Sequence, residues 1–248
     1  MDSLEARHIY DDRSGSDRMI TIVGVGHVFD IGDQVRDVIL RRSPSVVCVE
    51  LDPARYQALM TQDVRGSAPL PYKALAFFQK QIAKKYGQDV GREMVAAVQS
   101  AQQVGARIAF IDLDSLQVFQ KFWRMMSFKE RIKLVFALVT SIFVPKKTVD
   151  KEIRKFEESE AEYIESFGAE FPSAKKVLID DRNTHMAHAI RKLHDEFGNL
   201  VAVVGDGHVD GLQRLLGNES LEIIRLKDLR SMVVDGSSVS YSFRIEEN

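Results

Sequence analysis

Two apolar strands that each lead into a Gly-x-Gly-His sequence constrain the fold more than any other feature of this chain. The first, residues 19–23, continues into GVGH at 24–27, and the second, residues 200–204, continues into GDGH at 205–208. Strands that are apolar on both faces are typical of a parallel sheet covered by helices. Glycines permit a short loop in which each His ring turns toward the sheet. The repeat therefore predicts two imidazoles at one edge of a sheet.

Residues 19–51 predict a βαβ unit. Apolar side chains recur at helical spacing after the first strand, Pro44 ends that helix, and residues 46–49 form a second apolar strand that leads into Glu50. A right-handed crossover would set the two strands side by side. His27 and Glu50 would then lie along the same carboxyl edge, where open α/β sheets bind their ligands.

The rest of the chain favours one α/β domain over residues 19–248, after a polar lead-in at 1–18. A third strand at 106–111 runs into Asp112. We expect a mostly parallel central sheet with flanking helices and a C-terminal β-hairpin with an Asp-Gly turn. A helical insertion at about 114–170 is expected to lie over the sheet edge.

Composition gives no reason to expect a nucleic-acid partner. The chain has 248 residues, 28% of them charged, and a formal net charge of -2, whereas nucleic-acid-binding domains are usually strongly basic. Its one cysteine, Cys48, lies in an apolar strand and has no internal partner for a disulfide. With a polar N-terminus that lacks a signal-peptide core, these features indicate a reducing, cytoplasmic setting.

An aromatic and basic region at 119–144 allows three interpretations. It contains the single tryptophan, Trp123, and an apolar run at 134–144 that is about half of the ~20 residues needed to cross a bilayer. The region could pack as a lid over the sheet edge, form a homodimer surface, or lie as a peripheral patch on a membrane.

A later helix, around residues 177–193, has an informative polar distribution. Arg182 falls on its apolar face and Asn183 near the margin of that face, whereas His185 and His188 fall on the opposite, solvated face. A buried guanidinium needs a carboxylate or an anionic ligand, because an unpaired buried charge costs several kcal/mol. Arg182 is therefore expected to point into a site.

These polar groups, all facing inward or placed at the sheet edge, form a candidate site: His27, Glu50, Asp112, Arg182, Asn183 and His208. Imidazoles and carboxylates could hold a divalent metal and activate a bound water, with His27, Glu50, Asp112 and His208 as candidate ligands. Without a metal, one His could act as general base while Arg182 receives developing negative charge. Both routes lead to hydrolysis.

Four features occur together in this chain: the paired GxxH motifs, Glu50 after the second strand, Asp112 after the third, and the Arg182-Asn183 pair. In these features the chain resembles the TraB/PrgY (pheromone shutdown) family. That family belongs to a superfamily with the Tiki proteases, erythromycin esterases and ChaN-like proteins. The resemblance, over about residues 19–226, implies a hydrolase-like α/β fold, a peptide or related small-molecule substrate, and a divalent metal such as Mn, Co or Zn. His27 and His208 would be the motif histidines, and Glu50 their acidic partner.

Two other functions are compatible with these motifs. A dinucleotide-binding loop would share the first two glycines and the acid at Glu50, but its third glycine is replaced by Phe29, and Asp30 would repel a pyrophosphate. A non-catalytic protein that binds a peptide or a metal would use the same fold, because fold alone does not determine reaction.

Overall fold

The structure is a computed structural model, and it describes residues 18–26, 29–61, 91–141, 160–217 and 219–232. Its centre is a sheet of five strands, all parallel, in the order β3-β2-β4-β1-β5. The strands are β1 (Ile20–Val25), β2 (Val46–Val49), β3 (Arg107–Phe110), β4 (Leu200–Gly205) and β5 (Leu221–Ile224). The predicted α/β class and parallel sheet are confirmed.

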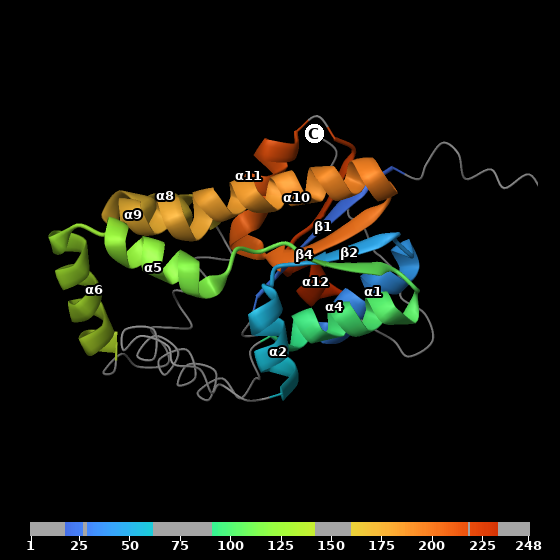
Figure 1. Cartoon of the computed structure of the whole chain (residues 1–248), viewed down its shortest axis with the longest axis horizontal. Coiled ribbons are helices and arrows are strands. Elements are labelled where there is room, and N and C mark those ends of the chain that lie inside the picture. The colour runs from blue at the N-terminus through green and yellow to red at the C-terminus, as the bar shows by residue number, and fades with distance from the viewer. Residues whose placement is uncertain (1–17, 27–28, 62–90, 142–159, 218, 233–248) are drawn as a thin grey trace, which may run out of the picture.

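Helices cover both faces of the sheet (Figure 1). One face carries α1 (Gly32–Arg42), α4 (Arg92–Gln103) and α12 (Leu226–Ser231), and the other carries α10 (Asp181–Phe197) and α11 (Asp206–Leu216). The short α2 (Pro53–Thr61) follows β2. The remaining helices extend from one end of the sheet: α5 (Ser115–Met125), α6 (Phe128–Ser141), α8 (Glu160–Glu170), α9 (Pro172–Lys175) and a π-helical turn, η1 (Lys176–Asp180).

The alternation of side chains along the strands divides the core into two layers. In β1, Val23 and Val25 pack with α1, α4 and α12, whereas Ile20 and Ile22 pack with α10 and α11. All four side chains are buried, as expected for a central strand of a covered parallel sheet. Cys48 belongs to the second layer, where burial raises the pKa of its thiol to about 12. It is therefore an unreactive packing residue.

Helices α5, α6, α8 and α9 form a third apolar cluster beside the sheet. Phe119 and Phe122 from α5 are buried there with Val177 from η1. Glu130 in α6 is also buried and accepts hydrogen bonds from Ser127 and from Ser173 at the start of α9. The aromatic region predicted at 119–144 thus has buried side chains in its described part, up to Leu134.

Three sequence-based expectations need correction or lie outside the described residues. Strands β1 and β2 are not neighbours, because β4 lies between them and pairs with both. The second Gly-x-Gly-His segment is not a loop, because α11 begins at Asp206 directly after β4. Ser231 ends helix α12 and so begins no strand, while the rest of the predicted hairpin, 233–248, lies outside the described residues, as does the lead-in at 1–17.

Gly24 illustrates how closely β1 approaches the start of α11. A Cβ at this position would lie 2.0 Å from an oxygen of Asp206. That carboxylate accepts hydrogen bonds from the backbone N–H of Leu226 at 2.9 Å and from the Arg225 guanidinium, so it holds the beginning of α12. The absence of a side chain at 24 therefore leaves room for a carboxylate that joins the start of α11 to the start of α12.

We predict that Gly24→Ala lowers the free energy of unfolding by about 2 kcal/mol, because the added methyl must displace a hydrogen-bonded carboxylate from a packed site. Urea denaturation followed by circular dichroism measures the loss. Gly32→Ala is the matched control, since its Cβ would meet nothing closer than 3.4 Å. Equal stability of the two variants would contradict this explanation of Gly24.

Candidate active site at the carboxyl edge of the sheet

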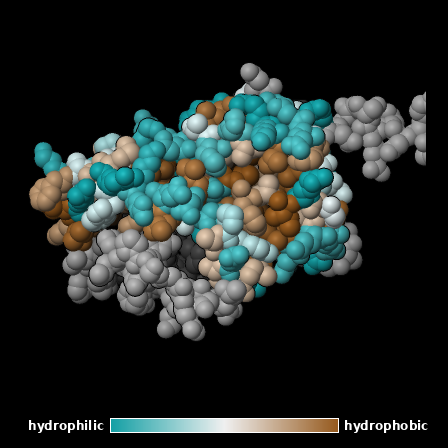
Figure 2. All heavy atoms as spheres, viewed as in Figure 1, coloured by the Kyte–Doolittle hydropathy of each residue, from teal (hydrophilic) through white to brown (hydrophobic). Residues whose placement is uncertain are grey.

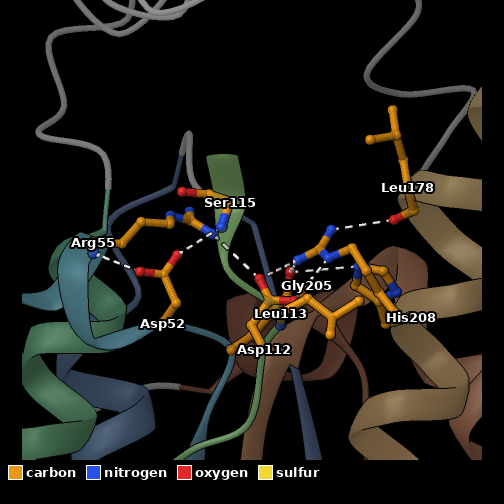
Figure 3. A network of polar contacts seen from close by, with 10 residues as sticks. Asp52, Arg55, Asp112, Leu113, Ser115, Leu178, Gly205 and His208 are labelled. Atoms are coloured by element: carbon orange, nitrogen blue, oxygen red, sulfur yellow. Dashed lines mark hydrogen bonds and ion pairs between the residues drawn. The ribbon is translucent and has the colours of Figure 1, made fainter. Parts of the chain in front are cut away.

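Polar side chains from four separate segments meet at the carboxyl ends of β2, β3 and β4 (Figure 3). Glu50 directly follows β2, Asp112 lies two residues beyond β3, and His208 lies in the first turn of α11, just after β4. Arg182 reaches them from the first turn of α10. The sheet topology makes this possible, because β2 is flanked by β3 on one side and by β4 on the other.

Arg182 is the centre of the cluster. Its Nε and Nη2 donate to the two oxygens of Asp112 at 2.9 and 2.7 Å, and Nη2 also donates to Glu50. Nη1 donates to the carbonyl oxygen of Leu178 in η1 at 3.2 Å. The side chain is 15% exposed, so the bidentate pair with Asp112 is a largely desolvated, charge-assisted contact.

His208 is held through both ring nitrogens. Nδ1 lies 2.7 Å from Oδ1 of Asn183, and Nε2 lies 3.4 Å from Oε1 of Glu50. All three residues are buried. If the amide oxygen of Asn183 accepts the Nδ1 proton, Nε2 carries either a lone pair or a second proton that faces the carboxylate.

The second oxygen of Glu50 accepts the backbone N–H of Gly205 at 2.6 Å. Burial alone would raise the pKa of Glu50, but the positive charges and hydrogen bonds of His208 and Arg182 and the Gly205 N–H outweigh it and hold that pKa well below its ordinary value. Burial would lower the pKa of Arg182, but Glu50 and Asp112 raise it. Both groups are therefore ionised over the physiological range.

Glycine makes room for Asn183 beside His208. A Cβ at Gly211, one turn along α11 from the histidine, would lie 2.0 Å from the amide nitrogen of Asn183. Helices α10 and α11 therefore approach closely at this point, and that approach sets the position of the Asn183 amide.

The structure brings together five of the six candidate site residues: Glu50, Asp112, Arg182, Asn183 and His208. The sixth, His27, lies outside the described residues. His185 and His188 are exposed, as the helical pattern predicts. Within the described ranges no group of three or more His, Cys, Asp or Glu side chains is arranged to hold a metal ion.

Arg55 and Asp52 border the cluster but were not among the site residues predicted from the sequence. Arg55 Nη1 lies 3.4 Å from Asp112, and Asp52 accepts the backbone N–H groups of Arg55 at 2.9 Å and of Ser115 at 3.1 Å. Asp52 therefore joins the starts of α2 and α5. The Asp-Pro sequence indicates that a helix starts here, directly after the second strand. A basic residue three positions after that aspartate lies in the first turn of this helix, and this position could have identified Arg55 as a neighbour of the site.

The structural class is that of an α/β protein with a parallel sheet. A largely buried cluster of His, Glu, Asp and Arg side chains lies at the carboxyl edge of this sheet. The TraB/PrgY/gumN family model matches residues 12–223, and the chain belongs to this family. The chain is also 28% identical over 258 residues to the uncharacterized protein MJ1365 of Methanocaldococcus jannaschii. That alignment covers 94% of this chain and 65% of the relative, so the chain spans about two thirds of that protein's length.

We predict that Arg182→Met destabilises the protein by about 3 kcal/mol or more, because it removes the guanidinium that both buried carboxylates contact. Urea denaturation near neutral pH measures the effect. Arg191→Met in the same helix is the matched control, since its ion pair with Glu219 is 43% exposed on the arginine side and should contribute less than about 1 kcal/mol. Similar losses in both variants would contradict a special role for the buried pair.

We predict that the stability difference between wild type and Glu50→Gln depends on pH. The pKa of Glu50 is lower in the folded state, so its contribution is complete above the unfolded pKa of about 4.3 and is lost as the pH falls through the folded pKa. Urea unfolding from neutral to acidic pH should show the difference shrink below about pH 4. Exposed Glu196→Gln is the matched control, and a pH-independent difference for Glu50→Gln would refute the assignment.

Proposed function

We propose that this protein is a hydrolase of peptide or related acyl bonds, and that the reaction takes place at the Glu50, Arg182 and His208 cluster. The observation that carries the proposal is the contact between His208 Nε2 and Glu50 Oε1 at 3.4 Å. When Nδ1 donates to Asn183 and the ring is neutral, Nε2 and the carboxylate oxygen present electron pairs to each other. A proton or a metal cation between them resolves that repulsion, and either one is useful for hydrolysis.

A divalent metal fits part of this donor set. His208 Nε2 and Glu50 would be two of its ligands, and the Nδ1 contact with Asn183 is the outer hydrogen bond that metal-bound histidines usually make. His27 is proposed from the sequence as the third. Such a metal, when bound, lowers the pKa of a coordinated water and polarises a carbonyl group.

Asp112 is better suited to hold Arg182 than to bind a metal. Both of its oxygens already accept hydrogen bonds from the Arg182 guanidinium, and one also accepts the Leu113 N–H at 2.8 Å. In our proposal Asp112 positions Arg182 and is not one of the ligands.

The residues of the chain have separate tasks in this proposal. Asn183 fixes the ring of His208, whose Nε2 accepts or delivers a proton at the reacting group. The described contacts use four of the five N–H groups of Arg182, so one remains at Nη1 for a developing negative charge. Arg182 also keeps Glu50 ionised.

We predict that Mn, Co or Zn raises the melting temperature of the wild type and supports cleavage of a peptide library, and that His208→Asn loses both effects. Removal of a catalytic base or ligand should lower the rate by about a hundredfold or more. His188→Asn is the matched control, because His188 is an exposed histidine of α10. Differential scanning fluorimetry and mass spectrometry of the products provide the measurements.

The outcomes separate the alternatives. Cleavage that persists after chelation, but not in His208→Asn, would support His208 as a general base without a metal. Metal-dependent stabilisation without cleavage of any peptide or ester would favour the non-catalytic binding protein. Unchanged cleavage in His208→Asn would refute the proposed site.

A further inference from the structure

Helix α6 carries an apolar face that points away from the protein. Phe128, Ile132, Val135 and Phe136 follow one another at helical spacing and are each more than half exposed, with Phe128 at 76% and Phe136 at 69%. We call these four residues the α6 face. Figure 2 shows brown, apolar spheres at the end of the molecule where α6 lies. Large apolar side chains gathered in this way usually mark an interaction surface.

The described residues of α5 and α6 are mostly basic where they are charged. Residues 115–141 contain one acidic residue, Glu130, and five basic ones: Lys121, Arg124, Lys129, Arg131 and Lys133. The whole chain, in contrast, has a net charge of -2. The basic character is therefore local to this region.

Glu130, the single acid, is turned inward. One of its oxygens accepts the N–H and Oγ–H of Ser127 at 2.7 and 2.8 Å, and the other accepts the N–H of Ser173 at 3.0 Å. This carboxylate joins the start of α6 to the start of α9. Its inward position leaves Arg124, Lys129 and Lys133 exposed beside the α6 face, and among these Lys133 lies 3.7 Å from Glu170.

An apolar hollow adjoins the face. It is lined by Trp123, Arg131, Ile132, Val135 and Phe136. The guanidinium of Arg131 lies 5.4 Å from the centre of the Trp123 ring and donates to the Trp123 carbonyl oxygen at 2.8 Å. A tryptophan next to arginine and exposed phenylalanines is typical of helices that lie in the interface of a bilayer.

We propose that the α6 face binds the surface of an anionic lipid membrane, with its phenylalanines in the interface and its lysines and arginines at the headgroups. Charge complementarity selects this partner. A symmetric contact with a second copy would place the same basic groups opposite one another, which is unfavourable. In the described part of the chain no helix is both long and apolar enough to cross a membrane.

Vesicle co-sedimentation of the full chain tests the proposal. We predict binding to vesicles of phosphatidylcholine mixed with phosphatidylserine, weaker binding to phosphatidylcholine alone, and loss of binding as salt is raised. Phe128→Ser should weaken binding about tenfold or more through lost apolar burial, and Lys129→Glu about fivefold or more through reversed charge. Both side chains are exposed, so neither change should unfold the protein.

Two controls match these variants. Leu215→Ser removes an exposed apolar side chain from α11, and Lys192→Glu reverses an exposed charge on α10; both should bind as wild type does. Equal binding by Phe128→Ser and Leu215→Ser, or no binding by the wild type, would overturn the proposal. So would a dimer in light scattering that Phe128→Ser converts to a monomer. None of these outcomes depends on hydrolysis at His208.

Discussion

The ion pairs of Arg182 are the constraint on which the rest of the site depends. Glu50 and Asp112 follow neighbouring parallel strands, so the fold brings two buried carboxylates to one edge of the sheet. Two such charges would repel each other, and one would have to take up a proton. A single guanidinium from α10 contacts both carboxylates and helps to hold the pKa of Glu50 below its ordinary value. The position of α10 is thereby fixed relative to β2 and β3.

The cluster gathers several charged groups in a largely buried place. Arg182 contacts both carboxylates, Arg55 lies 3.4 Å from Asp112, and Oε1 of Glu50 faces Nε2 of His208. Replacing a buried ion network by apolar residues is often neutral or stabilising, so stability alone is a weak reason to retain one. Stability is therefore a weak explanation of the cluster, and the proposed reaction or cation at His208 offers another.

The sequence predicts the elements of the fold well but not their order in the sheet. Runs such as residues 46–49 and 200–204 are apolar on both faces, and that pattern alone identifies buried parallel strands. Nothing local indicates which strand becomes the neighbour of β1, so the insertion of β4 between β1 and β2 could not be foreseen. The error is small for the site, because all parallel strands end at the same edge.

Site residues were predictable where a periodic pattern determines direction. The helical pattern places Arg182 inward and His188 outward, and the structure confirms both. The partners were harder to foresee. Asn183 reaches His208 where Gly211 leaves space on α11, and Glu130 accepts a hydrogen bond from Ser173 at the start of α9, 43 residues away in the chain. Such contacts depend on how far apart two helices or strands lie. The spacing of residues within one segment of the chain gives no information about that distance.

The helices that extend from the end of the sheet, α5 to α9 and η1, are joined to the rest of the protein close to the candidate site residues. Asp52, two residues after Glu50, accepts the N–H of Ser115 at the start of α5, and η1 runs directly into α10, with the Leu178 carbonyl bonded to Arg182. The α6 face lies in this same group of helices. If the α6 face rests on a lipid surface, these two attachments hold the His208 cluster at a set position relative to that surface. A substrate presented at the membrane would then meet a site whose orientation the fold has already determined.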